Sequence, residues 1–482
     1  MTRATRRDLL AAAGLALFEA APARAFFSSP GPRVVVVGAG GAGLAAAVEA
    51  ARCGARVTLM EKQPAVGGDT LISGGFFAAV DPKRQRPLGI DDSIERFTAD
   101  ILESGGGKSD PALARILARG AAAMLERLES LGMKFQSDVI EIYGAHWPRC
   151  HKPMMPNGVG YVQALHAEAL RLGVEIRTDC AVVGIETDAA GGVAGVNALH
   201  RQRRLHRSAD AVVIASGGFG ANARMVERWQ PRLAGLTTDN TPGSTGEMLE
   251  IAERDCGAQL IDMPEIQCLP GCPANRRHRV RLHNDVSRFI FVNRSGRRFC
   301  REDERRDVLR DTVLALPGRL AYTITDAAGL RSYDILVQKE AVLGIETGDA
   351  WSSPTLEGLA EAMGLPPENV VEAVADYNAG VQLGRDRFRK SPQELRHFIL
   401  EPPFWGCFAA MTIHYTMGGL RITPRAQVVD RSGRVVRGLF AAGQAAGGLH
   451  GINRMGANGI NDALVFGTIA GREAALLRDS VS

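Results

Sequence analysis

Apolar runs that end in glycine mark the start of the folded part of the chain. Residues 33–37 (Arg-Val-Val-Val-Val) form a β-branched run, typical of a strand buried in a parallel sheet. The run passes directly into the glycine-rich segment 38–43 and then into an alanine-rich stretch of helical character. Residues 56–60 form a second apolar run that ends at Glu61. The pattern predicts a strand, a tight turn, a helix and a second strand within about thirty residues, which indicates an α/β fold.

Two later segments repeat the sequence of a strand followed by glycines. Residues 211–215 are apolar and lead into the glycine-rich segment 216–220. Residues 438–444 have the same pattern, and a helix is predicted from residue 458 to about residue 477. Three such units, spread over the chain, are typical of an extended dinucleotide held across one edge of a sheet. If these glycines were plain turns, that would explain one unit but not all three.

The first glycine segment has the Gly-x-Gly-x-x-Gly spacing of a dinucleotide-binding turn. Gly38 allows the turn, Gly40 lets the backbone approach a pyrophosphate, and Gly43 lets the helix pack on the sheet. The helix N-terminus offers unpaired N–H groups to the phosphate, and Glu61 accepts hydrogen bonds from ribose hydroxyls. A second glycine-rich stretch, 67–75, favours FAD over NAD. The pattern assigns these residues to the cofactor: Gly38, Gly40, Ala42, Gly43, Glu61, Lys62, Gly68, Asp69, Thr70, Gly74, Gly75, Ser216, Gly217, Gly459 and Ile460.

The first 25 residues have the features of an export signal. Arg6 and Arg7 precede a short apolar run that ends at Phe18, and residues 23–25 (Ala-Arg-Ala) form a small-residue cleavage pattern. Paired arginines in this position resemble a twin-arginine signal, which exports folded proteins. We expect residues 1–25 to be this signal, residues 26–32 a linker, and the mature protein to be soluble and periplasmic. A frayed basic helix is the alternative.

Composition excludes several classes of protein. The net charge is +4, and about half of it lies in the first 25 residues, too little for an electrostatic nucleic-acid binder. The 8 cysteines include no Cys-x-x-Cys pair, so neither a zinc site nor covalent c-type haem is predicted. A disulfide between Cys268 and Cys272 stays open. Since no segment offers about eighteen uninterrupted apolar residues, we expect no stable membrane insertion.

Four motifs carry a resemblance to one family. They are 245–247 (Thr-Gly-Glu), 291–299 (Phe-Val-Asn-Arg-Ser-Gly-Arg-Arg-Phe), 414–419 (His-Tyr-Thr-Met-Gly-Gly) and 450–458 (His-Gly-Ile-Asn-Arg-Met-Gly-Ala-Asn). From about residue 34 to residue 474 the chain resembles the flavoprotein subunits of fumarate reductase and succinate dehydrogenase, especially the soluble periplasmic flavocytochrome c type. The resemblance implies a Rossmann-like FAD-binding domain built from residues 33–263 and 412–482, with an inserted α+β capping domain at 264–411. It adds Glu247, Tyr415 and Gln444 to the expected cofactor contacts.

The resemblance also implies an enzyme that transfers hydride from flavin N5 to a carbon–carbon double bond next to a carboxylate. In the family pattern Arg454 anchors a carboxylate, His414 binds the same or the other carboxylate, and Arg306 donates the proton. Gln267 and Ala457 are expected in the same substrate site. Without their motif contexts, Arg306 in the charged run 301–306 is typical of a solvated helix face and a lone histidine of a structural role.

Departures from the family pattern concern the far end of the substrate pocket. Leu269 stands where the dicarboxylate enzymes carry a second histidine. A gapless count back from Asn293 puts Arg281, Leu282 and Asp285 where the family has a Thr-Glu pair and an arginine. We therefore expect one carboxylate anchor to remain and Asp285 to repel a second carboxylate.

These departures favour an unsaturated monocarboxylate over fumarate. Urocanate suits the pocket if Asp285 pairs with its imidazole, and acrylate-type or aryl-acrylate acids suit the apolar Leu269 and Leu282 with Phe289 nearby. The aromatic and basic segment 143–151 either faces this pocket or is an exposed loop. Fumarate reductase or succinate dehydrogenase activity proper is the alternative.

The mode of FAD binding and the electron partner follow from two absences in the sequence. No histidine lies in residues 67–75, the stretch comparable to the covalent attachment site of membrane-bound members, so we expect noncovalent FAD. Since the chain has no haem motif, a separate periplasmic cytochrome or other electron donor is the expected partner. A ketosteroid-type flavin dehydrogenase and a noncatalytic flavin electron carrier are further alternatives.

Overall fold

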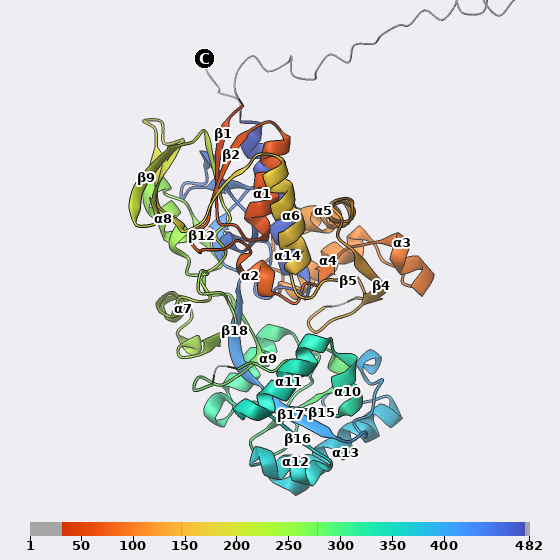
Figure 1. Ribbon diagram of the computed structural model, residues 1–482. Helices are drawn as coiled ribbons and strands as arrows, with labels where there is room; N and C mark the ends of the chain where they lie inside the picture. Colours follow the sequence, from red (N-terminus) through yellow and green to blue (C-terminus); the bar gives the residue numbers. More distant parts are fainter. Residues whose placement is uncertain (1–30, 146, 277, 478–482) are drawn as a thin grey trace, which may run out of the picture. The chain divides into compact units, whose positions relative to one another are not determined.

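The computed structural model describes residues 31–145, 147–276 and 278–477. The predicted export signal and most of the linker lie outside the described residues. A six-stranded sheet organises the N- and C-terminal parts of the described chain (Figure 1). Its strand order is β20 (Gln427–Val429), β21 (Val435–Ala441), β10 (Ala211–Ile214), β1 (Arg33–Val37), β2 (Arg56–Met60) and β6 (Glu175–Arg177). The three predicted strand-and-glycine units are therefore neighbours in one sheet.

Parallel pairing brings the three glycine turns to one edge of this sheet. β1 pairs in parallel with both β2 and β10, and β10 pairs in parallel with β21. Because the carboxyl ends of parallel strands meet at the same edge, segments 38–43, 215–220 and 442–444 follow their strands side by side. All four valines of β1 are buried, as its continuous apolar run predicts.

Two helices that cover this sheet are in direct backbone contact with each other. α1 (Gly41–Arg52) begins at the first glycine turn, and α14 (Asn458–Ala475) packs against it (Figure 1). A Cβ atom at Gly467 would lie 2.4 Å from the Ala42 carbonyl oxygen, and one at Gly471 would lie 2.1 Å from that of Ala46. The two glycines therefore let the helices approach more closely than any side chain allows.

A pair of antiparallel strands carries substrate-site candidates from distant parts of the sequence. β13 (Ile266–Gly271) pairs with β18 (Ala410–Thr416), and Gln267 lies opposite Tyr415 in the register. A bulge between Gln267 and Cys268 shifts the register by one residue. Bulges re-aim side chains, and here the shift occurs beside the residues expected to contact substrate.

The middle of the chain builds a second sheet with its own core. The strand order is β14 (Ile290–Asn293), β15 (Ala321–Thr325), β17 (Phe404–Phe408) and β16 (Ala350–Ser353), all antiparallel. α12 (Leu356–Met363) and α13 (Pro367–Leu383) pack on it with buried Leu359, Val370 and Tyr377. The α+β character expected for residues 264–411 agrees with this arrangement, whereas the domain boundaries themselves stay a prediction.

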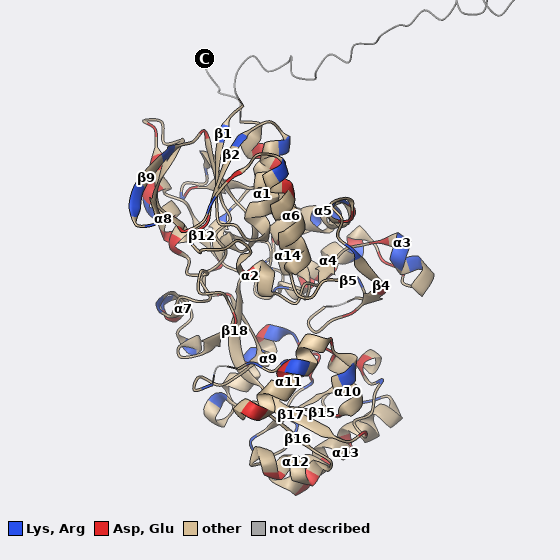
Figure 2. Ribbon diagram, in the orientation of Figure 1, with Lys and Arg blue, Asp and Glu red and all other residues tan. Residues whose placement is uncertain are grey.

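Charged side chains of both signs are interspersed over the described elements, with a basic stretch on β9 (Arg203–Ser208) (Figure 2). In the described part of the chain no helix is long and apolar enough to span a membrane. The same residues contain no cluster of histidine, cysteine and carboxylate side chains suited to a metal ion. The eight cysteines are free thiols, Cys268 and Cys272 included.

Candidate active site

One cavity of about 850 Å³ joins the glycine turns to the expected substrate residues. This volume lies within the range of cofactor and ligand pockets, about 300–1,000 Å³. Every residue expected to contact the cofactor lines the cavity except Gly43. Arg306, His414, Arg454 and Ala457 line it as well. The chain positions of these residues are far apart, so the fold alone brings them to one place.

The glycine turn leaves its backbone open to a ligand. A Cβ atom at Gly38 would lie 2.4 Å from the Ala215 carbonyl oxygen, and one at Gly43 would lie 1.8 Å from that of Gly38. These two glycines therefore serve the turn and the helix packing. At Gly40 a Cβ would meet nothing closer than 3.8 Å, and its backbone borders the cavity. The turn fits a pyrophosphate at the N-terminus of α1.

Polar groups around the turn also suit a dinucleotide. Glu61 accepts hydrogen bonds from the backbone N–H groups of Ala39 and Gln63, both at 2.8 Å. Its carboxylate keeps further lone pairs for ribose hydroxyls. The hydroxyl of Ser216 is buried without a partner among the described residues although Ser216 lines the cavity. An orphaned hydroxyl at this position fits a bound polar group.

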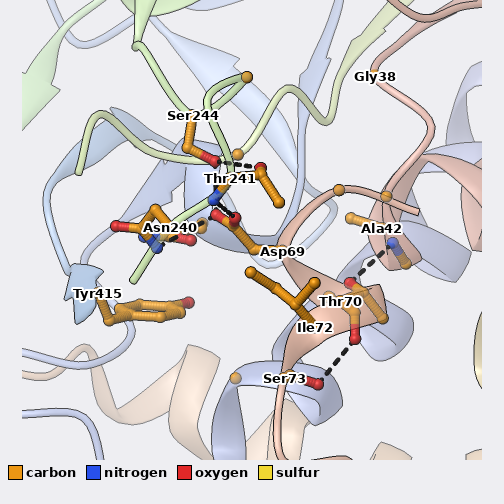
Figure 3. Close-up of a pocket in the computed structure, with 18 of the residues that line it drawn as sticks. Gly38, Ala42, Asp69, Thr70, Ile72, Ser73, Asn240, Thr241, Ser244 and Tyr415 are labelled. Carbon is orange, nitrogen blue, oxygen red and sulfur yellow. Dashed lines mark hydrogen bonds between the residues drawn. The ribbon is translucent and has the colours of Figure 1, made fainter. Parts of the chain in front are cut away.

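Asp69 and Thr70 hold two walls of the cavity together (Figure 3). Asp69, in α2 (Gly68–Ile72), accepts hydrogen bonds from the Thr241 N–H at 2.6 Å and the Ser244 hydroxyl at 2.5 Å. Thr70 Oγ1 accepts from the Gly41 N–H at 3.0 Å. Lys62 forms an ion pair with Glu247 at 2.8 Å. The carboxylates of Asp69 and Glu247 are thus engaged with protein groups at the rim of the cofactor region.

Two buried arginines face the same cavity and have no acidic partner among the described residues. Arg306 begins α9 (Arg306–Leu314), and Arg454 lies in the segment before α14. Gln267 Oε1 accepts a hydrogen bond from Arg306 at 3.1 Å and another from Arg454 at 3.0 Å. The Nε atoms of both arginines are buried and unpartnered among the described residues. Since a buried charge is costly unless it is paired, this pair fits an anionic ligand.

Burial changes the acidity of both guanidinium groups. Burial and the charge of Arg454 lower the pKa of Arg306 to about 9. Burial also lowers the pKa of Arg454 below its usual value. Arg306 stays protonated at neutral pH but releases a proton far more readily than an exposed arginine does.

His414 is oriented by a carboxylate. Its Nδ1 atom lies 3.0 Å from Asp239 Oδ2, and Asp239 also forms an ion pair with Arg279. Burial opposes ionisation of Asp239, but the charges of His414 and Arg279 hold its pKa at about 2. Burial lowers the pKa of His414, against the opposing charge of Asp239. The imidazole is therefore neutral at neutral pH, with its Nδ1–H donated to Asp239 and Nε2 left for a ligand.

The far wall of the cavity differs from the one that gapless counting predicts. Asp285 does not line it, because its carboxylate caps a turn of 3₁₀ helix, η3 (Val286–Arg288), by accepting from the Ser287 N–H at 3.0 Å. Leu282 is fully buried in the core of the middle sheet and does not line the cavity either. Gln267 lies behind the wall and acts on the cavity through the two arginines. Leu269 does line it.

Several lining residues carry no motif that identified them beforehand. They are Asp239, Arg279, His283 and Glu340, joined by Arg281, which gapless counting named for another role. Arg281 forms an ion pair with Glu340 of α11 (Ile335–Thr347). Tyr143 belongs to the aromatic and basic segment 143–151, so one end of that segment reaches the cavity. For Arg279, Arg281 and His283, the sequence signal was their alternation with apolar residues along the chain.

These features fit a nucleotide-binding α/β protein in which two buried arginines line the cavity beside the cofactor region. A family model described as "FAD binding domain" matches residues 33–460, and the chain belongs to this family. The chain is 34% identical over 462 residues to a urocanate reductase of Eggerthella lenta, covering 92% of this chain and 74% of the relative. It is 30% identical over 498 residues to an acrylate reductase flavoprotein subunit of Shewanella woodyi, covering 96% of each.

A solved structure supports the same family assignment. The structure of the open conformation of a flavocytochrome c3 fumarate reductase superposes with a TM-score of 0.75 at 32% identity, over 92% of this chain and 78% of that one. The predicted fold class and the resemblance to the fumarate reductase flavoproteins are confirmed. The protein is an FAD-dependent oxidoreductase.

We expect FAD to be released when the protein is denatured. Among residues 67–75, which form one wall of the cavity, no histidine is available for a covalent link. Acid precipitation of the FAD-loaded protein, followed by absorption spectra of pellet and supernatant, checks this. Flavin that stays with the polypeptide would contradict it.

Proposed function

We propose that the protein reduces the carbon–carbon double bond of an unsaturated monocarboxylate. The observation that carries the proposal is the pair of buried arginines, Arg306 and Arg454. Both line the cavity, and neither has an acidic partner among the described residues. Relatives that reduce urocanate and acrylate, and a similar fumarate reductase structure, support the reaction class. Since these proteins act on different acids, the residues of the pocket decide between the candidate substrates.

The residues divide the reaction between anchoring and proton transfer. Reduced FAD supplies a hydride when bound, which ends on the β carbon of the double bond. Arg454 holds the substrate carboxylate with its guanidinium fork and stabilises the negative charge that develops there. Arg306 gives its proton to the α carbon, so one hydride and one proton complete the saturated acid. The lowered pKa of Arg306 supports this role.

The charges of the far wall support a single carboxylate anchor. Arg279 is paired with Asp239 and Arg281 with Glu340, so neither cation is free for a second carboxylate. Leu269 adds an apolar surface to the same wall. An unsaturated monocarboxylate such as urocanate or an acrylate-type acid satisfies these features better than fumarate does.

Anaerobic oxidation of reduced viologen by the FAD-loaded protein tests the proposal. The acids are fumarate, urocanate, acrylate, methacrylate and cinnamate. We expect turnover of a monocarboxylate and almost no turnover of fumarate. Strong turnover of fumarate would contradict the single anchor, and silence with every acid would favour the ketosteroid-type dehydrogenase or the electron carrier.

Carboxylate binding should weaken as the pH rises through neutrality. The groups that face His414 are Asp239, Arg279 and Arg454, and burial keeps the imidazole neutral in the free protein. A bound carboxylate favours the imidazolium, so binding takes up one proton. Above the lowered pKa of His414, the affinity therefore falls about tenfold per pH unit until the pKa of the complex is reached.

Titration of the flavin absorption with the saturated product acid at several pH values measures this slope. His414→Gln should flatten it. His206→Gln is the matched control, because His206 pairs with Glu186 at 2.8 Å, does not line the cavity and should leave the slope intact. A slope that persists in His414→Gln would refute the assignment.

The cellular setting completes the proposal. We propose that residues 1–25 export the folded protein to the periplasm and that a separate cytochrome or other donor supplies the electrons. The acrylate reductase relative is named a flavoprotein subunit, which supports a separate donor. We also propose residues 33–263 and 412–482 as the FAD-binding domain and 264–411 as the cap. Turnover with native periplasmic cytochromes tests the partner, and activity with oxygen alone would count against it.

A further inference from the structure

A second group of unsatisfied polar atoms lines the cavity beside Arg306. Nδ1 of His283 and the hydroxyl of Tyr143 are buried without a hydrogen-bond partner among the described residues. The two side chains are 2% and 5% exposed, and both line the cavity. Their rings are in edge contact, with centroids 6.1 Å apart. Because buried polar atoms are nearly always paired, two orphans in one cavity wall indicate a ligand group.

Arg306 connects this pair to the proposed catalytic residues. Tyr143 and His283 lie on the side of the Arg306 guanidinium opposite to Gln267. Nη1 of Arg306 donates to Gln267, whereas Nη2 donates to the backbone carbonyl of Tyr143. The Arg306 guanidinium also lies over the Tyr143 ring, 5.1 Å from its centroid. A substrate held by Arg454 next to Gln267 and protonated by Arg306 therefore extends toward Tyr143 and His283.

Both side chains are neutral hydrogen-bonding groups. Burial holds the pKa of His283 well below its usual value, and the charges of Arg279, Arg281 and Arg306 lower it further. Burial raises the pKa of the Tyr143 hydroxyl. A neutral imidazole offers one N–H and one lone pair, and the hydroxyl offers both roles as well. The wall can therefore donate and accept hydrogen bonds without a net charge.

The surrounding charges select the occupant. Of the three arginines near His283, Arg279 and Arg281 each have an acidic partner, and Arg306 serves the reacting end of the acid, so no further cation among the described residues is left for a second carboxylate. A cationic group would lie against three arginines. We propose that His283 and Tyr143 form a neutral subsite that binds an uncharged polar group, such as a hydroxyl, an amide or a ring N–H, on the end of the unsaturated acid remote from its carboxylate. This subsite rests on the proposed reductase function.

Matched acids test the subsite in the full-length FAD-loaded protein. Cinnamate and its para-hydroxy derivative share the double bond and the carboxylate and differ by one hydroxyl. The kcat/KM ratio is measured with reduced viologen, and the dissociation constants of the saturated acids are measured from flavin absorption. Wild type should favour the hydroxylated acid about ten- to a hundredfold, the value of a buried hydrogen bond that would otherwise be unmade.

Tyr143→Phe and His283→Phe should each remove most of that preference in both readouts. Tyr143→Phe deletes a hydroxyl that bonds no described residue, so it should fold and retain FAD even if His283→Phe does not. Tyr322→Phe, a buried tyrosine of the middle sheet that does not line the cavity, should keep the wild-type ratio.

Two results would overturn the subsite. An equal preference for the two acids in wild type is one, and an unchanged preference in Tyr143→Phe is the other. Both leave the reductase function standing, because the acids are still reduced. If neither acid is bound or reduced and the acids of the wider panel are also inert, the proposed function fails and the subsite with it.

Discussion

Arg306→Gln should lower turnover by about 10²- to 10⁴-fold, the usual contribution of a positioned general acid. The reason is that Arg306 is buried, faces the cavity and has a pKa lowered to about 9, which suits it to supply the proton. Glutamine keeps a hydrogen-bonding amide but holds no transferable proton. FAD retention should be unchanged, and kcat should fall far more than the affinity for the saturated acid.

Arg305→Gln is the matched control for this prediction. Arg305 precedes Arg306, pairs with Asp307 at 2.9 Å and does not line the cavity. Loss of a partly exposed ion pair of this kind costs about 1 kcal/mol, so turnover should stay close to wild type. Equal losses in the two variants, or full turnover in Arg306→Gln, would refute Arg306 as the proton donor.

Arg454→Gln should raise KM by about 30-fold or more. Removing one partner of a buried charged hydrogen bond costs about 2–5 kcal/mol, and about 1.4 kcal/mol corresponds to tenfold. Arg454 lies over the Tyr415 ring, 4.6 Å from its centroid, which fixes the fork without neutralising it. The affinity for the saturated acid, measured from flavin absorption, should fall by the same factor.

The same variant should not destabilise the ligand-free protein. Arg454 is buried with no acidic partner within ion-pair distance among the described residues, so its removal leaves no orphaned carboxylate. The thermal midpoint of the FAD-loaded protein should therefore hold or rise while binding is lost. Arg421→Gln, an exposed arginine of β19 (Gly419–Arg421), should change neither quantity. A large drop in thermal midpoint with normal KM would make Arg454 a structural residue.

Local pattern was sufficient to predict the sheet and the cofactor end of the site. The valine run of β1 and the spacing of Gly38, Gly40 and Gly43 can each be interpreted from a few consecutive residues. An apolar run must be buried, and a tight turn needs glycine. The convergence of Arg306, His414 and Arg454 followed from motif resemblance, because no local rule states which distant segments meet.

The far wall was not predictable in the same way. Counting residues fixes a position in the chain but not the direction of its side chain. Leu282, buried in a core, and His283, which lines the cavity, are adjacent residues. Asp285 turns away because its carboxylate satisfies backbone and hydroxyl groups of the following turn. Asp239 escaped notice because its role depends on a contact with His414, 175 residues away.

The most direct test of the central claim is a single turnover with no electron donor in excess of the reduced flavin. FAD-loaded protein is reduced anaerobically with one equivalent of dithionite and mixed with the monocarboxylate that the viologen assay selects. The account predicts complete reoxidation of the flavin and one saturated acid per FAD, with Arg306→Gln reoxidised far more slowly. Flavin that stays reduced in the presence of every unsaturated acid would contradict it.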